Sequence, residues 1–198
     1  MSVSRHRFSQ GLTYHQYKAQ MTRNRERLEA NERNLQIGPE DLAAFRNLPQ
    51  GLDVLVLAED WCGDVINNLP ILGRLAQESG KLNLRVFLRD KNLDLMDQYL
   101  KEGRYRSIPT FVFFDQNWNE MGAFKERPDS VTQLWAQKRK EIYAQNPDFG
   151  SLETPVSELP EGVRVRLQQA MAAMYEETRP FANQQVIREL RQIVERAP

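Results

Sequence analysis

The clearest pattern along the chain is a nearly continuous aliphatic run at residues 52–58, LDVLVLA, bounded by Gly51 and by Glu59. Such a run is typical of a strand that is covered on both faces. Three further apolar runs are shorter: 84–88, 111–114 and 121–124. The last two are separated by turn residues that begin at Asp115. We therefore predict four strands, the last two of which form an antiparallel hairpin.

Apolar residues at helical spacing predict helices before, between and after these strands. After Thr13, apolar residues recur from Tyr14 to Leu28 at helical spacing, which predicts one long amphipathic helix. Gly38-Pro39 breaks this pattern and begins a short second helix. The remaining predicted helices are 66–78, 93–100, 131–144, 160–178 and about 181–195.

The order of these elements defines a fold class. From residue 52 to residue 125 the order is strand, helix, strand, helix, strand, strand, which predicts an α/β fold with a mixed sheet and helices on both faces. A chain of 198 residues accommodates this domain together with appended helices. We expect an N-terminal helical extension at 1–50, the core at 51–127, and a C-terminal helical region at 128–198 packed on the core.

The amino-acid composition disfavours several classes of function. Lys and Arg number 27 and so do Asp and Glu, so there is no overall field to favour nucleic acid or an anionic membrane as partner. The segment MSVSRHRFSQ is polar and basic, and no apolar run is long enough to cross a bilayer, so we expect a cytoplasmic protein. One cysteine excludes an intramolecular disulfide, and two histidines disfavour a zinc site. We expect no metal and no cofactor.

Candidate chemistry lies at residues 59–65, EDWCGDV, where a buried strand ends and a helix begins. A cysteine at a helix N-terminus faces unpaired backbone N–H groups and the positive end of the helix dipole, and both favour the thiolate. Each of the acidic residues Glu59, Asp60 and Asp64 that points toward the sulfur raises the pKa of Cys62. Asp64 also has a purely structural interpretation, because an acidic residue in the first turn stabilises a helix.

A second segment, Ser107-Ile108-Pro109-Thr110, directly precedes the apolar run that begins at Phe111. By itself this segment is explained structurally, since proline is tolerated where a strand begins. Together with the cysteine segment it is more specific. The stretch 61–72, WCGDVINNLPIL, resembles the active-site helix of the thioredoxin family, and Pro70 falls at that family's kinking proline.

The resemblance covers roughly residues 52–125 and implies a thioredoxin-like fold. It also implies that Pro109 is cis and packs beside the reactive sulfur, and that the backbone of the residue before it pairs with an extended substrate. Cys62 is then the nucleophile. The implied substrate-binding residues are Trp61, Gly63, Asp64, Ile108, Pro109 and Thr110, and Asp90 also resembles a family position.

Three departures from the family pattern restrict the implied activity. Val65 takes the place of the second, resolving cysteine, Asp64 that of the usual intervening proline, and Val56 that of the buried acid which assists proton transfer. Cys62 can form a mixed disulfide, but an external thiol must resolve it. The resemblance thus implies a monothiol thiol-disulfide oxidoreductase acting on a protein or a low-molecular-weight thiol or disulfide.

Other functions stay open at this point. The main alternative is a redox-inactive module that binds a protein or peptide through the same groove. A glutathione-transferase-like enzyme also joins a thioredoxin-like domain to helices, but that architecture starts near its first strand, whereas about fifty residues precede it here. Some glutaredoxins hold an iron–sulfur cluster through one cysteine, although their other features are not evident in this sequence.

Overall fold

The computed structural model describes residues 3–196, which fall into two compact units. Residues 3–127 and 186–196 form the first unit, and residues 128–185 form the second. This division differs from the sequence-based one, in which all residues after 127 belong to a single helical region. Residues 186–196 belong to the unit that contains the sheet.

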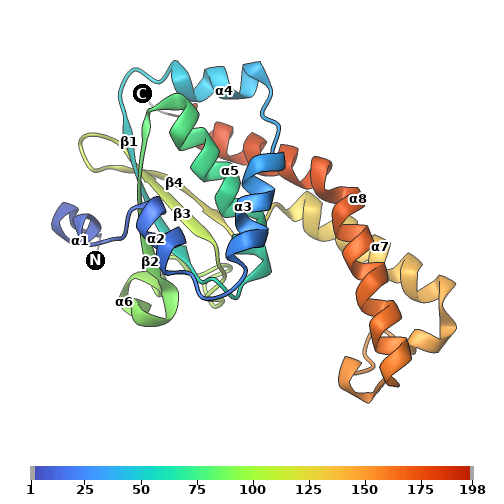
Figure 1. Ribbon diagram of the computed structural model, residues 1–198. Coiled ribbons are helices and arrows are strands. Elements are labelled where there is room, and N and C mark those ends of the chain that lie inside the picture. Colours follow the sequence, from blue (N-terminus) through green and yellow to red (C-terminus); the bar gives the residue numbers. More distant parts are fainter. Residues whose placement is uncertain (1–2, 197–198) are drawn as a thin grey trace. The chain divides into compact units, whose positions relative to one another are not determined.

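A four-stranded mixed sheet forms the centre of the first unit (Figure 1). Its strands are β1 (Leu52–Ala58), β2 (Leu82–Leu88), β3 (Thr110–Phe114) and β4 (Glu120–Lys125). The strand order is β2-β1-β3-β4, with β1 and β2 parallel and the other two pairs antiparallel. In register, Val56 of β1 lies between Val86 of β2 and Phe111 of β3. The predicted fold class and the hairpin are confirmed.

The apolar runs form these strands because both faces of the sheet are covered. In β1 every residue except Asp53 is buried. Phe111 of β3 stacks on Phe124 of β4, with ring centres 5.2 Å apart. Leu12, from the N-terminal region, exchanges backbone hydrogen bonds of 2.7 and 2.9 Å with Val86, so part of the outer edge of β2 is also covered.

The helices of the first unit surround this sheet, and Figure 1 shows their order along the chain. They are α1 (Arg5–Ser9), α2 (Tyr14–Gln20), α3 (Arg25–Asn34), α4 (Pro39–Arg46), α5 (Gly63–Ser79) and the short α6 (Leu93–Met96). A 3-10 turn, η1 (Arg89–Lys91), follows β2. Helix α6 is shorter than the predicted 93–100, because the chain turns after Met96.

The prediction of one long helix from Tyr14 to Leu28 is wrong, because the chain breaks between α2 and α3. Asn24 adopts a left-handed conformation, φ 55°, and Met21 is extended. The carboxylate of Asp60 accepts hydrogen bonds from the backbone N–H of Thr22 at 2.8 Å and of Arg23 at 3.0 Å. A distant acidic residue therefore satisfies the backbone groups that the break exposes.

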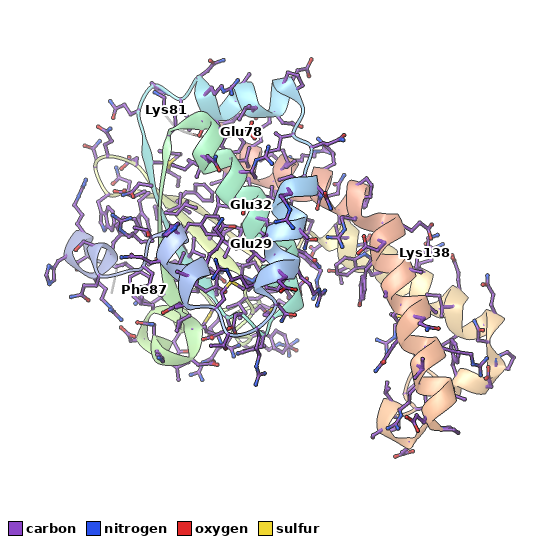
Figure 2. All side chains as sticks on the ribbon, in the orientation of Figure 1. Glu29, Glu32, Glu78, Lys81, Phe87 and Lys138 are labelled. Atoms are coloured by element: carbon purple, nitrogen blue, oxygen red, sulfur yellow. The ribbon has the colours of Figure 1, made fainter. Side chains whose placement is uncertain are left out.

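The N-terminal helices are attached to α5 by close contacts. A Cβ atom at Gly73 of α5 would lie 2.3 Å from the ring of Tyr14, so only glycine admits this approach. Arg74 of α5 donates to the backbone carbonyl of Glu32 at 2.8 Å and pairs with Glu78. Figure 2 labels these two partners, Glu32 on α3 and Glu78 on α5. These contacts place α2 and α3 along α5, whose N-cap residue is Cys62.

The C-terminal part contains α7 (Asp129–Gln145), the 3-10 turns η2 (Pro147–Phe149) and η3 (Val156–Glu158), and α8 (Glu161–Val194). The two predicted helices 160–178 and 181–195 are one helix, with Pro180 inside it. A proline removes one helical hydrogen bond, and here both flanking segments remain helical. The second unit has its own small core of Tyr143, Phe149, Leu159 and Leu167.

Candidate functional site

Cys62 lies at the N-cap of α5, in the turn that follows β1. Its backbone has φ −85° and ψ 122°, and no side chain caps this end of the helix. The Cys62 carbonyl accepts the first helical hydrogen bond, from Ile66 N–H at 3.1 Å. The thiol is partly exposed, and the backbone N–H groups of Asp64 and Val65 interact with its sulfur. The sequence therefore positions the sulfur as expected for a cysteine that begins a helix.

The pKa of the Cys62 thiol lies above its ordinary value, and burial is the largest cause. The Asp64 carboxylate raises this pKa further, whereas the backbone N–H groups of Val65 and Asp64 and the Arg127 guanidinium lower it. The sequence indicated a competition between the helix terminus and the carboxylates. In the folded protein, desolvation by burial outweighs the groups that favour the thiolate.

Asp64 forms a bidentate ion pair that the sequence did not suggest. The Nε and Nη2 atoms of Arg127, which follows β4, donate to the two carboxylate oxygens of Asp64 at 2.9 and 2.5 Å. The same guanidinium donates to Glu126 at 2.7 Å. The Asp64 and Arg127 side chains are only 14% and 23% exposed. A pair of this kind connects the start of the active-site helix to the end of the sheet.

The Ile108–Pro109 segment lies against Cys62. The Cys62 thiol donates to the carbonyl of Ile108, with 3.5 Å between sulfur and oxygen. The Ile108–Pro109 peptide bond is cis. The Pro109 carbonyl accepts from Glu126 N–H at 2.7 Å, and the buried hydroxyl of Thr110 donates to the Ser107 carbonyl at 2.9 Å. The Pro109 carbonyl and the Thr110 hydroxyl therefore already have hydrogen-bond partners within the protein.

Trp61 and Gly63 form the exposed part of the site. Trp61 is 44% exposed, and the Arg89 guanidinium carbon lies 5.0 Å from the centre of its ring. Arg89 itself is held by Asp90 and by the Arg106 carbonyl, at 3.0 Å from the latter. A Cβ atom added at Gly63 would meet nothing within 4 Å. A fixed indole ring and an open backbone therefore flank the thiol on its solvent side.

Several residues that shape the site come from segments far from Cys62 in the sequence. Arg127 and Arg89 belong to this group, and no local motif marks them. The sequence suggests Asp60 only as an acidic neighbour of the thiol, whereas its carboxylate accepts hydrogen bonds from the backbone of Thr22 and Arg23.

Two positions that carry chemistry elsewhere in thioredoxin-like proteins hold valine here. Val65 and Val56 are both fully buried and apolar. Within residues 3–196, no group of three or more His, Cys, Asp or Glu side chains is arranged to hold a metal ion. In the same described part of the chain, no helix has the length and apolar character that crossing a membrane requires. The sequence contains one cysteine, so Cys62 is the thiol of this site.

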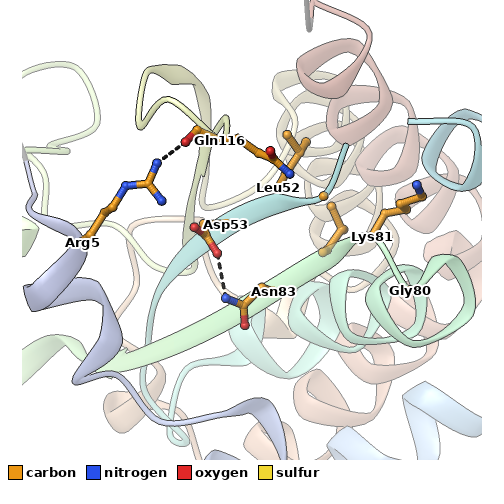
Figure 3. Close-up of a pocket in the computed structure, with 9 residues that line it drawn as sticks. Arg5, Leu52, Asp53, Gly80, Lys81, Asn83 and Gln116 are labelled. Carbon is orange, nitrogen blue, oxygen red and sulfur yellow. Dashed lines mark hydrogen bonds between the residues drawn. The ribbon is translucent and has the colours of Figure 1, made fainter. Parts of the chain in front are cut away.

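A separate polar cavity of about 530 Å³ lies where β1 and β2 begin, at the end of these strands away from Cys62 (Figure 3). Asn83 donates to the Asp53 carboxylate at 2.7 Å, and Arg5 donates to the Gln116 carbonyl. Figure 3 shows both pairs across the cavity, with no thiol or hydroxyl among its labelled residues. Two pairs of its polar groups are joined by hydrogen bonds, and its lining residues include no cysteine, serine, threonine or tyrosine.

The fold defines a class of protein, the proteins with a thioredoxin-like fold, and a single thiol lies at the N-cap of α5. The family model described as thioredoxin matches residues 11–140, about two thirds of the chain. The chain belongs to the thioredoxin family. No curated protein is significantly similar to it in sequence.

Two solved structures share the fold at low sequence identity. An HIV epitope scaffold is 15% identical with a TM-score of 0.64, and the match covers 96% of each chain. A protein of unknown function from Pseudomonas aeruginosa is 17% identical with a TM-score of 0.59, covering 86% of this chain and 95% of the other. The germline-specific thioredoxin Deadhead from Drosophila melanogaster is 28% identical over 46% of this chain and 83% of its own, with a TM-score of 0.33.

Proposed function

We propose that the protein is a monothiol thiol-disulfide exchange protein that forms mixed disulfides through Cys62. The observation that carries the proposal is the position of the Cys62 sulfur. It is partly exposed at the N-cap of α5 and lies 3.5 Å from the carbonyl of Ile108, so a partner that reaches the thiol also meets the Ile108–Pro109 segment.

The exchange reaction needs no cofactor. The Cys62 thiolate attacks one sulfur of a partner disulfide, a new bond forms between the Cys62 sulfur and that sulfur, and the other partner sulfur leaves as a thiolate. Because the buried Val65 cannot act as a resolving thiol, an external thiolate must then attack the mixed disulfide. That second exchange regenerates the Cys62 thiolate and leaves the partner disulfide-linked to the external thiol.

The raised pKa of Cys62 makes this protein a slow exchanger near neutral pH. Because burial raises the pKa of Cys62, less of the thiol is ionised near neutral pH than in a free cysteine. A thiolate of high pKa is intrinsically more nucleophilic, which offsets part of this loss. Trp61 and Gly63 provide the exposed contact surface for a protein or low-molecular-weight partner.

A second function is favoured by the same raised pKa together with the buried valine at position 65. In this alternative the site binds a protein or peptide beside Trp61 and Cys62 without any exchange of disulfides. A thiol that stays protonated and has no resolving partner is well suited to such a module. The two functions differ in whether the sulfur of Cys62 becomes covalently linked.

The distinguishing experiment measures covalent capture. The reduced protein is mixed with oxidised glutathione at pH 8, and intact mass is followed over time, with Cys62→Ala as control. We expect one glutathione to be added to the wild-type protein and none to the variant, and added thiol to remove it. A wild-type protein that stays unmodified after hours would contradict monothiol exchange and favour the binding module.

Val65→Cys tests whether resolution is the missing step. Position 65 lies one turn into α5, three residues after Cys62, so a thiol there is placed near the sulfur of Cys62. We expect this variant to reduce a protein disulfide repeatedly when a reductant is supplied, and the wild type to do so poorly. Equal turnover by the two proteins would show that the lack of a second thiol does not limit the reaction.

A further inference from the structure

The chain leaves β4 through a left-handed turn at Glu126, whose backbone φ is 67°. A residue other than glycine rarely adopts this conformation, and it persists only where its surroundings hold it. The Glu126 N–H donates to the Pro109 carbonyl at 2.7 Å, and the Glu126 carbonyl accepts from the Asn68 amide at 2.8 Å. The Glu126 carboxylate accepts from Lys101 at 3.0 Å and from Arg127 at 2.7 Å. All the polar groups of this residue therefore have partners that fix the turn.

The backbone partners of this turn lie on two sides of the candidate site. Pro109 directly follows Ile108, whose carbonyl accepts from the Cys62 thiol. Asn68 lies on α5, and its side chain is 5% exposed, so a buried amide makes the contact with Glu126. The turn at Glu126 therefore connects the Ile108–Pro109 segment to α5 without using the thiol.

Arg127 makes a second connection, one residue further along the chain. Its guanidinium donates to both carboxylate oxygens of Asp64, in the first turn of α5, and to the Glu126 carboxylate. Lys101, Glu126, Arg127 and Asp64 thus form a row of alternating charges, and each side chain is at most 23% exposed. A planar guanidinium that binds two carboxylates fixes their positions as well as balancing their charge.

We propose that Arg127 is a positioning residue for disulfide exchange, which holds the first turn of α5 and the turn at Glu126 in one arrangement around the Cys62 sulfur. The inference rests on the proposed function and extends it. The sulfur is carried by the start of α5, whereas the carbonyl that lies 3.5 Å from it is carried by the Ile108–Pro109 segment. A partner disulfide that reaches the sulfur meets both, so the rate of exchange is sensitive to small changes in their separation.

The positive charge of Arg127 also lowers the pKa of Cys62, so a test must separate position from charge. Arg127→Lys does so, because lysine keeps the charge but lacks the planar group that binds two carboxylates. Arg74→Lys is the matched control. Arg74 lies further along the same helix, is 27% exposed, and pairs with Glu78 through two nitrogens of its guanidinium.

Two rates are measured in the wild type and in both variants: capture of oxidised glutathione and alkylation of Cys62 by iodoacetamide. Alkylation between pH 6 and pH 10 reports the thiolate population, whereas capture also requires a disulfide to fit beside the Ile108–Pro109 segment. We expect Arg127→Lys to slow capture roughly fivefold and to keep alkylation within about twofold of the wild type. We expect Arg74→Lys to leave both rates unchanged.

Equal slowing of capture and alkylation in Arg127→Lys would overturn the inference, because the thiolate population would then have fallen. Unchanged capture would also overturn it, and so would equal slowing of capture in Arg74→Lys.

Hydrogen exchange at the Glu126 N–H, which donates to the Pro109 carbonyl, provides a readout that needs no disulfide. We expect this exchange to be faster in Arg127→Lys than in the wild type, and an unchanged rate would show that Arg127 does not hold the turn. If the wild type captured no glutathione, the proposed function would fail. The Glu126 readout would still decide whether Arg127 holds the two elements together.

Discussion

The sheet unit and the helical unit reach stability in different ways. In the sheet unit the strands are buried on both faces, and the apolar residues of β1 and β3 are almost completely covered. The helical unit has a small core cluster of Tyr143, Phe149, Leu159 and Leu167, and several of its large apolar side chains are about 40% exposed: Val156, Val165, Tyr175 and Phe181. The thiol and its supporting residues all belong to the sheet unit. The sulfur is therefore placed by the unit that has the larger core.

The largest expected effect is in the centre of the sheet. Phe111→Ala removes a fully buried ring that stacks on Phe124, so we expect it to lower the free energy of unfolding by about 3–5 kcal/mol. Urea unfolding followed by circular dichroism measures this loss. Phe181→Ala is the matched control in the helical unit, where a 42% exposed ring should cost about 0.5 kcal/mol or less. Equal losses would contradict the contrast between the units.

A smaller effect is expected in the core of the helical unit. Leu167→Ala leaves a cavity beside Tyr143 and Phe149, and we expect a loss of about 2 kcal/mol that is confined to that unit. Hydrogen exchange measures it residue by residue, with faster exchange in α7 and in the first part of α8 and unchanged exchange in β1. If β1 exchanged faster to the same degree, the two units would unfold together.

The attachment of α2 to α5 is tested by adding one methyl group. Gly73→Ala places a Cβ atom against the Tyr14 ring, so we expect a loss of about 1–3 kcal/mol as α2 is displaced. Gly162→Ala is the control, because a Cβ atom there meets nothing within 4 Å and alanine favours the helix. Thermal unfolding measures both variants. A Gly73→Ala protein as stable as Gly162→Ala would show that this contact adjusts freely.

The smallest effect concerns the charge beside the thiol. Asp64→Asn removes a carboxylate that raises the pKa of Cys62, and it keeps the Arg127 guanidinium, which lowers that pKa. We therefore expect alkylation of Cys62 near neutral pH to be roughly threefold faster. Asp41→Asn is the control, since Asp41 also lies in the first turn of a helix and pairs with an arginine, Arg191. A Cys62 pKa at or above that of the wild type in Asp64→Asn would show that Asp64 serves only to hold Arg127.

The order of strands and helices in the sheet unit was predictable because β1 and β3 bury nearly continuous apolar runs. Residues 52–58 and 111–114 have a pattern that no exposed segment shares, and both are strands. The break between α2 and α3 was not predictable, since the apolar spacing continues through it. Asp60 stabilises that break from 36 or more residues away, and nothing in the local sequence indicates this contact.

The candidate site divides in the same way. The position of Cys62 at the start of a helix was predicted from local sequence, because a strand end and a glycine restrict the backbone locally. Its proximity to the Ile108–Pro109 segment was implied only by the resemblance to the thioredoxin family, since 46 residues separate Cys62 from Ile108. The pKa of the thiol could not be predicted, because burial and a distant arginine act through space. Neighbouring residues determine the local backbone conformation, whereas burial and electrostatic effects depend on which distant residues are packed together.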